Sequence, residues 1–518
     1  MSPLPPDSLA GSSAQPLPAN VAAGILSVDR KGWLAAAESV REAGATLLAL
    51  WGSDDRDRDG RFHVQAAYLF PSELLVVEHA LAPGETTFPD LAPLFPAAGR
   101  LQRALADLLG IRADAGDPRR WLRHGSWPET VFPLRRDVDP ARPYPPASDP
   151  YPFVSVAGDG VHEIAVGPVH AGIIEPGGFR FSVVGEKVLR LEERLGYTHK
   201  GVDRRFESFS QLEGHRLAAR VSGDTAVAFS WAYCAALEAM TLRAVPPRAC
   251  ALRALALERE RLANHLGDLG ALGNDAGFAF GLAQFSRLKE DLLRANDAAF
   301  GARYLLDQVV PGGVAEDLAP EVEALLADQH RVLERDLLEL RGIYDEHAGL
   351  QDRFHDAGRL DPGLARTLGA IGLAGRASGL PRDLRVDQPW PPYDRLAPRL
   401  AVRTEGDVAA RVQLRFDEAV ESLRQCRALL DDLPPGRVRT EVLAAPAGHR
   451  GLGVIEGWRG PVMVALEAGP EGSIRRCHAH DPSWQNWPLL EFAILGNIVP
   501  DFPLINKSFN LSYSGHDL

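Results

Sequence analysis

The segment between residues 133 and 155 limits what this chain can fold into more than any other stretch. It is dense in prolines, which lock φ and lack a backbone N–H donor, so it favours neither a regular helix nor the interior of a sheet. Such a composition is typical of a linker. We therefore expect two domains, over residues 21–132 and 156–518, and a disordered tail over residues 1–20, which are rich in proline and serine.

The two predicted domains differ in their hydrophobic periodicity. Before the linker, apolar runs over residues 63–70 and 74–79 predict strands, and the spacing over 101–109 predicts a helix. After it, short strands at 163–166 and 178–184 lead into mostly helical sequence, with long helices predicted at 248–272, 283–294, 322–344 and 412–433. The expected fold class is α+β: a small N-terminal α/β sandwich domain and a large helix-rich domain with small flanking sheets.

Composition argues against several classes of protein. The formal net charge is −13 and no basic cluster is interleaved with aromatic residues, so no nucleic-acid partner is expected. The four cysteines form no C-x-x-C pair, which excludes a disulfide scaffold and a conventional zinc or iron–sulfur cradle. No window approaches the roughly 20 apolar residues that span a bilayer. No Gly-x-Gly-x-x-Gly fingerprint follows a strand, so the chain is not expected to bind a dinucleotide itself.

Four short motifs carry the functional argument. They are GPVHAGIIEPGGFRF at 167–181, GYTHKG at 196–201, RLANHL at 261–266 and DFPLINKS at 501–508. Taken singly they are weak signals, because Glu175 could be an ordinary solvated turn acid. In this order they resemble the large subunits of [NiFe] hydrogenases and the quinone-site, 49-kDa-type subunit of complex I. The resemblance is strongest to hydrogenase-4 component G-like subunits.

The N-terminal part carries a second resemblance. FPAA at 95–98, DLLGI at 107–111 and WP at 127–128, followed by PLRRD at 133–137, resemble the 30-kDa-type subunit of complex I. The resemblance implies that the two subunits are fused in this chain.

Four positions decide whether a nickel–iron centre is expected. Active [NiFe] enzymes hold the metals with two C-x-x-C pairs, because soft thiolates suit nickel and low-valent iron. In the resemblance these pairs correspond to Ser222 and Thr225, and to Ser512 and Gly515. The resemblance therefore implies no nickel–iron centre and no metal bound by this chain. The sequence stops about where the second motif ends, so we expect no C-terminal extension to be cleaved.

The resemblance to complex I implies a quinone pocket in the space where active hydrogenases hold the nickel–iron centre. The tyrosine that holds the quinone headgroup there corresponds to Gly223, and its partner histidine to about Ile174 or Glu175. A pocket with a different polar lining is therefore expected. Its candidate residues are Glu175, His170, Ser222, Asp224 and Thr225, and Glu175 is the candidate proton relay.

Two further residues match the shared pattern. Arg220 and His265 correspond to the arginine and histidine that lie against the terminal [4Fe–4S] cluster of a neighbouring small subunit, where positive or donor groups raise the cluster potential. Glu258, Arg261 and His265 share one face of the predicted helix at spacings of three and four, so Glu258 and Arg261 are the candidate local partners of the histidine. The alternative is a buried, salt-bridged face without a redox role.

Together these features predict a peripheral-arm subunit on the cytoplasmic face of the inner membrane. It would pass electrons from an iron–sulfur small subunit to quinone or a similar acceptor, beside antiporter-like membrane subunits. The donor stays open, with NADH through further NADH-oxidising subunits as one option. The alternative is a non-catalytic scaffold of a hydrogenase-related complex. An active [NiFe] hydrogenase is disfavoured, since the thiolate ligands have no substitute here.

Overall fold

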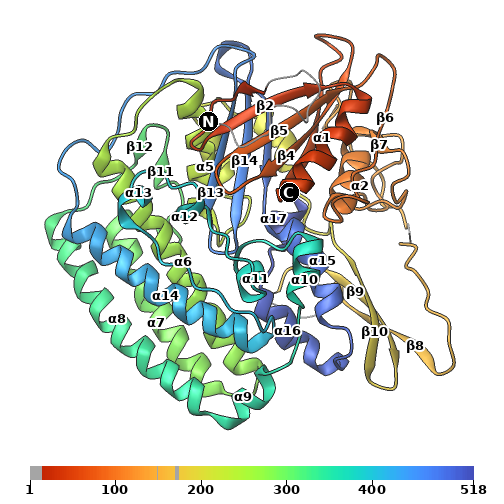
Figure 1. Cartoon of the computed structure of the whole chain (residues 1–518). Helices are drawn as coiled ribbons and strands as arrows, with labels where there is room; N and C mark the ends of the chain where they lie inside the picture. Colours follow the sequence, from red (N-terminus) through yellow and green to blue (C-terminus); the bar gives the residue numbers. More distant parts are fainter. Residues whose placement is uncertain (1–13, 140, 149, 170–173) are drawn as a thin grey trace.

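The computed structural model describes residues 14–139, 141–148, 150–169 and 174–518. Helices and small sheets alternate along the chain, so the expected α+β fold class is confirmed. Figure 1 shows the N-terminal sheet on one side of the molecule and the long helices on the other, with the strands β8 (Val161–Val166), β9 (Gly178–Val184) and β10 (Lys187–Arg194) projecting at the edge.

The N-terminal part is a five-stranded sheet in the order β1-β2-β5-β4-β3, in which only β2 and β5 run parallel. Helix α1 (Arg30–Glu42) is capped by Asp29, whose carboxylate accepts the N–H of Gly32 in the first turn. The strands are β1 (Gln15–Pro16), β2 (Ala23–Val28), β3 (Thr46–Asp54), β4 (Phe62–Leu69) and β5 (Leu74–Ala80), with α1 (Arg30–Glu42), α2 (Ala98–Leu109) and the short pair β6 (Thr87–Phe88) and β7 (Arg112–Ala113). The predicted strands and helix of this part are confirmed, with ends shifted by one to three residues.

Ordered structure begins earlier than expected. Strand β1 lies within the expected tail, Ala19 bridges to Leu452, and the Asn20 side chain exchanges two 2.8 Å hydrogen bonds with the backbone of Val454. Gln15 and Pro16 therefore belong to the N-terminal sheet, while Ala19 and Asn20 contact residues of a second sheet, and the prediction of a disordered tail is wrong for these four residues. The partners of Ala19 and Asn20 lie more than 400 residues away in sequence, so local composition gave no signal for these contacts.

The proline-rich segment forms neither a helix nor a strand among its described residues. It does not separate two independent bodies, however. Leu134 is buried, Arg136 hydrogen-bonds the backbone of both Asp54 and Arg475, and one hydrophobic core runs through the N-terminal sheet and the helical part. The segment is thus held along the junction between the two parts.

The larger part begins with the three-stranded antiparallel sheet β8 (Val161–Val166), β9 (Gly178–Val184) and β10 (Lys187–Arg194). Five long helices follow: α5 (Ala226–Met240), α6 (Pro247–Asp275), α7 (Ala279–Phe300), α8 (Pro320–Glu346) and α14 (Val408–Asp431). Proline occupies the first turn of α6 and of α8, where its missing N–H costs nothing. The four predicted long helices are confirmed as α6, α7, α8 and α14, which pack together in Figure 1.

Short elements connect these helices and complete the end of the chain. They are α3 (Val202–Arg205), α4 (Gly214–Ala218), β11 (Val309–Val310), β12 (Gly313–Val314), α9 (Ala348–Phe354), α10 (Pro362–Leu368), α11 (Gly372–Ala377), α12 (Leu384–Asp387), α13 (Tyr393–Leu396), α15 (Ser483–Ala493), α16 (Phe502–Phe509) and α17 (Tyr513–Asp517). Within the described residues, none of the helices combines the length and the apolar character needed to cross a bilayer.

A second antiparallel sheet, β13 (Arg450–Glu456), β14 (Pro461–Ala468) and β15 (Ile474–His480), packs on α5 and was not predicted. The contact is unusually close at Gly453, where a Cβ atom would lie 1.8 Å from the carbonyl oxygen of Ala232. The glycine therefore sets the distance between this sheet and the helix that begins at the functional site.

We expect Gly453→Ala to lower the free energy of unfolding by about 2 kcal/mol or more, because the added methyl would have to displace the backbone of α5. Urea unfolding of the purified chain measures it. The matched control is Gly342→Ala in α8, where nothing lies within 4 Å of the new Cβ. That change should raise the stability by up to about 1 kcal/mol through helix propensity. Equal effects at both positions would contradict the close-contact explanation.

Candidate functional site

A cavity of about 770 Å³ lies between the ends of α6 and α7, the helix α16 and the loop that enters α17. Its lining includes three of the predicted site residues, Glu175, Ser222 and Asp224, and also Gly223. His170 lies outside the described residues. The structure therefore gathers in one place residues that are separated by tens to hundreds of positions in the sequence.

The positions that correspond to the two metal-binding pairs meet at this cavity. The hydroxyl oxygens of Ser222 and Ser512 lie 2.9 Å apart, and Ser512 Oγ also accepts the N–H of Gly515. The Thr225 hydroxyl donates to Asp224 at 3.0 Å. These hydroxyls already take part in hydrogen bonds within the chain. Hydroxyls are also poor ligands for nickel and low-valent iron, so this set of side chains does not fit a nickel–iron centre. Among the described residues there is also no group of three or more His, Cys, Asp or Glu side chains arranged to hold a metal ion.

The carboxylate of Asp481 occupies the space beside Gly515, the fourth of the positions that correspond to the metal-binding cysteines. A Cβ atom at Gly515 would lie 2.5 Å from Asp481 Oδ2 and 2.9 Å from Ser512 Oγ. Asp481 is fully buried, and its Oδ1 accepts the N–H of Ser483 at 2.8 Å. A side chain at position 515, cysteine included, therefore has no room while Asp481 keeps this position.

An ion pair between Asp224 and Arg459 forms one wall of the cavity. Two nitrogens of the Arg459 guanidinium approach the Asp224 carboxylate to 2.6 and 2.8 Å, and Ser222 and Thr225 donate further hydrogen bonds to it. Burial opposes ionisation, but Arg459 and these donors hold the pKa of Asp224 well below its usual range. Asp224 therefore stays charged and serves as a fixed counter-ion.

Glu175 lies at the rim of the cavity. Its Oε2 accepts the backbone N–H of Ser514 at 3.1 Å, which ties the loop before β9 to the start of α17. The side chain is otherwise exposed, so it can reach both the cavity and solvent. This placement agrees with the predicted position of a proton relay, while the role itself stays a prediction.

Sequence reasoning missed a buried carboxyl behind this wall. Glu260 on α6 accepts the N–H groups of Val227 and Ala228 at 2.6 and 3.3 Å, at the N-terminus of α5. Burial, reinforced by the charge of Asp224, raises the pKa of Glu260 to about 8 against the opposing backbone hydrogen bonds. The only signal in the sequence was a glutamate four residues before Asn264 in the RLANHL region.

This pKa predicts a pH dependence of stability. The folded chain keeps the Glu260 proton up to about pH 8, whereas the unfolded chain releases it near pH 4.5, so the stability from this proton is complete below pH 4.5 and is lost as the pH rises to 8. We expect Glu260→Gln to flatten this decline by a few kcal/mol, since one pKa unit corresponds to about 1.4 kcal/mol. Urea unfolding at pH 5 and pH 8 measures it. The exposed Glu339→Gln should follow the wild type, and a parallel decline in both variants would contradict the assignment.

The two residues expected near a partner's cluster lie in different environments. Arg220 is at the surface, with 47% of its side chain exposed, and pairs with Asp307 at 2.7 Å. His265 is fully buried, and its Nε2 lies 3.0 Å from Glu418 Oε2. Burial lowers the pKa of His265 despite this carboxylate. The fold does not bring the two side chains into contact with each other.

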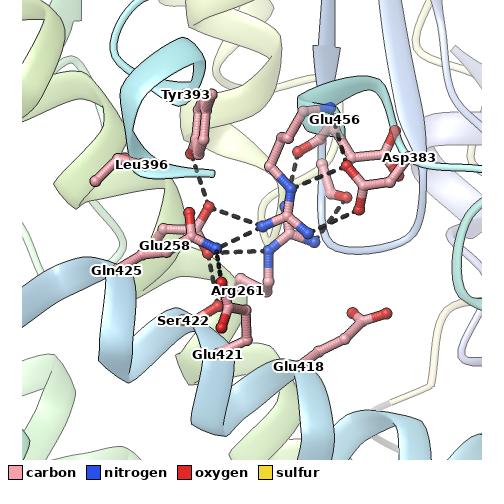
Figure 2. A network of polar contacts seen from close by, with 12 residues as sticks. Glu258, Arg261, Asp383, Tyr393, Leu396, Glu418, Glu421, Ser422, Gln425 and Glu456 are labelled. Atoms are coloured by element: carbon pink, nitrogen blue, oxygen red, sulfur yellow. Dashed lines mark hydrogen bonds and ion pairs between the residues drawn. The ribbon is translucent and has the colours of Figure 1, made fainter. Parts of the chain in front are cut away.

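The helix face that carries His265 is a buried polar network (Figure 2). Glu258 accepts hydrogen bonds from Tyr393 at 2.7 Å, Ser422 at 2.6 Å and Arg385 at 3.0 Å, and pairs with Arg261 at 3.3 Å. Glu258 and Arg261, the local partners expected for His265, thus pair with each other. His265 instead takes its partner from α14, a contact that the spacing along α6 did not predict.

Fold and site together define a large subunit of the kind shared by complex I and membrane-bound hydrogenases. Residues 275–450 match the family described as "Respiratory-chain NADH dehydrogenase, 49 Kd subunit", and residues 26–144 match "Respiratory-chain NADH dehydrogenase, 30 Kd subunit". The predicted fusion of the two subunit types is thus confirmed.

Relatives match along nearly the whole chain. Formate hydrogenlyase subunit 5 of Escherichia coli (strain K12) is 31% identical over 485 residues, which cover 92% of this chain and 85% of that protein. Hydrogenase-4 component G of the same organism is 31% identical over 479 residues, covering 91% and 83%. A chain of the membrane-bound sulfane sulfur reductase, an archaeal respiratory membrane complex, superposes with a TM-score of 0.66 at 23% identity, over 70% of this chain and 100% of that chain. The protein belongs to the family of fused 30-kDa and 49-kDa-type subunits that includes formate hydrogenlyase subunit 5 and hydrogenase-4 component G.

We expect Gly515→Ala to lower the free energy of unfolding by about 1 to 3 kcal/mol, because its methyl group would overlap the Asp481 carboxylate. In an Asp481→Ala background the same change should cost much less, so a double-mutant cycle should give a clear coupling energy. Additive effects of the two changes would show that Asp481 does not occupy the space of a side chain at position 515.

Proposed function

We propose that this chain is the peripheral acceptor-binding subunit of a membrane-bound respiratory or hydrogenase-4-like complex, on the cytoplasmic face of the membrane. It passes electrons from the [4Fe–4S] cluster of a small subunit to quinone or a similar acceptor. The chain itself binds no metal. Its partners are the iron–sulfur small subunit, antiporter-like membrane subunits and, where NADH is the donor, NADH-oxidising subunits.

The single observation that carries this proposal is the cavity of about 770 Å³. Drug-sized and cofactor-sized ligands occupy pockets of about 300 to 1,000 Å³. The cavity lies where the metal-binding pairs of hydrogenases would converge. It is lined by hydroxyls, by the ion pair of Asp224 and Arg459, and by apolar side chains such as Phe502. A carbonyl acceptor fits such a lining, because the guanidinium of Arg459 has five N–H donors and only four of them bind Asp224, Thr225 and Asn510.

Electrons and protons reach the acceptor by different routes. Electrons arrive from the partner's cluster, against which the resemblance implies that Arg220 and His265 lie. Protons arrive through Glu175, whose carboxylate lies at the rim in contact with the N–H of Ser514. Reduction of a quinone by two electrons forms two O–H bonds, so a titratable group at the rim is a chemical requirement of the reaction.

The test uses the purified complex with its cluster reduced chemically and then reoxidised by a short-chain quinone. We expect Glu175→Gln to slow quinone reduction at least about tenfold, because general acid–base groups typically contribute 10² to 10⁴ in rate. The cluster's EPR signal should stay unchanged in that variant. His265→Ala should instead shift the cluster's EPR signal or midpoint potential. Glu186→Gln, in the exposed turn between β9 and β10, is the matched control and should behave as wild type.

A scaffold without redox function is the second candidate. It is favoured by Gly223, which gives the cavity no side chain at the position where complex I has its quinone-binding tyrosine. An intact complex that contains the cluster but shows no quinone-linked turnover would support the scaffold and contradict electron transfer to quinone. Nickel analysis of the same preparation tests the expected absence of a nickel–iron centre.

A further inference from the structure

A lysine lines the cavity on the side of α16. Lys507 lies in the last turn of this helix, which packs on α6 and α14. Its side chain keeps 29% of its surface exposed, and its ammonium nitrogen lies 3.1 Å from Asp268 Oδ1. Asp268 is its only hydrogen-bond or ion-pair partner among the described residues. An ammonium has three N–H donors, so two of them remain for a ligand in the cavity.

The carboxylate of Asp268 is shared between two cations. It is buried on α6, and its Oδ2 lies 3.0 Å from two nitrogens of the Arg415 guanidinium. Its Oδ1 also accepts a 2.7 Å hydrogen bond from the Asn510 side chain. Burial opposes ionisation, but Lys507 and Arg415 hold the pKa of Asp268 below its usual range. One carboxylate therefore faces a guanidinium and an ammonium, and it compensates the charge of Lys507 only in part.

A second lysine lies beside this group, on α7. Lys289 is half-buried and lies over Gly267 of α6, where a Cβ atom would be 2.9 Å from the lysine nitrogen. It makes no hydrogen bond or ion pair with a described residue. Burial lowers the pKa of Lys289; Asp268 and Asp224 oppose this, and the charge of Lys507 adds to it. The two ammonium groups therefore repel each other, so this wall of the cavity favours an additional negative charge.

The carboxyl groups of the cavity lining do not supply that charge. Asp224 is held by Arg459, and Glu175 lies at the rim, where it binds the backbone of α17. Asp275 lies at the exposed end of α6. None of these three carboxyl groups makes an ion pair with Lys507. The remaining donors of Lys507 thus have no acceptor among the described residues, and a ligand oxygen that carries negative charge fits them.

We propose that the Lys507 ammonium is the subsite for the acceptor oxygen that becomes negatively charged on reduction. This inference rests on the proposed function, because it concerns the quinone-type acceptor of the same cavity. Two electrons from the partner's cluster and one proton convert a quinone into a quinol anion, whose charged oxygen pairs with Lys507. A second proton then forms the neutral quinol. Asp224 repels the anion and Lys507 attracts it, so the reduced headgroup is oriented with its charged oxygen toward α16.

The first test measures binding to the purified complex without turnover. The probes are a hydroxynaphthoquinone, which is ionised at neutral pH and carries a charged oxygen, and the uncharged methylnaphthoquinone of similar size. We expect Lys507→Gln to weaken binding of the ionised compound at least about tenfold, because a charge-assisted hydrogen bond is lost. Binding of the methyl compound should stay nearly unchanged. Lys507→Arg should retain most of the affinity. The matched control is Lys31→Gln on the exposed surface of α1, which should bind both compounds as wild type does.

The second test is steady-state reduction of methylnaphthoquinone. Lys507→Gln should lower kcat with little change in KM, because the contact with Lys507 strengthens only as the anion forms. If the wild-type complex reduces no quinone but binds the ionised compound through Lys507, the proposed function fails and the subsite stands. Equal weakening of both compounds by Lys507→Gln, wild-type affinity for the ionised compound in that variant, or an unchanged kcat in an active complex would overturn the inference.

Discussion

The buried carboxylate of Glu258 constrains the position of α6 and, through it, the walls of the cavity. A carboxylate with no exposed surface is destabilising by several kcal/mol unless charged and polar partners replace water. Those partners come from α12, α13 and α14, in Arg385, Tyr393 and Ser422 (Figure 2). Three separate segments must therefore dock before this side chain is satisfied. The network fixes α6 at a single register, because a shift by one residue would rotate Glu258 out of the group.

The same helix holds the cavity from its other face. Asn264 donates to the carbonyl of Asp224 at 2.8 Å, and Glu260 accepts the first N–H groups of α5. Arg459 then ties Asp224 to the carbonyl of Asn510 at 2.6 Å. These contacts use side chains and backbone groups of the chain alone. Among the described residues, the walls of the cavity are thus joined by hydrogen bonds and ion pairs.

How much of the fold and of the candidate site could be predicted from the sequence depends on how far apart in the sequence the contacting residues lie. The long helices followed from apolar periodicity, as in α6, and the gathering of Glu175, Ser222 and Asp224 followed from the resemblance to known subunits. Arg459 could not be placed, because its partner Asp224 is 235 residues away and nothing in the local pattern marks it. The hairpin of β13 and β14 was missed although its apolar runs flank the turn Gly457-Trp458-Arg459-Gly460, which is a hairpin signal. The spacing of residues along one helix cannot predict a partner on another helix, such as Glu418 of α14 for His265 of α6.

The surroundings sort the carboxyl groups near the cavity into two kinds. Asp224 faces a guanidinium and two hydroxyl donors, so its charge is fixed. Glu260 is equally buried but has weaker compensation, and burial raises its pKa to about 8. Burial and the charge of Glu491 raise the pKa of Glu193 well above its usual range, against the effect of Arg100. Enzymes separate acid from base by this kind of environmental contrast. In the proposed reduction, negative charge would develop on the acceptor beside Asp224, whose fixed charge repels it. Protonation of the acceptor removes that repulsion, so the proposed reaction would be favoured by delivery of protons together with the electrons.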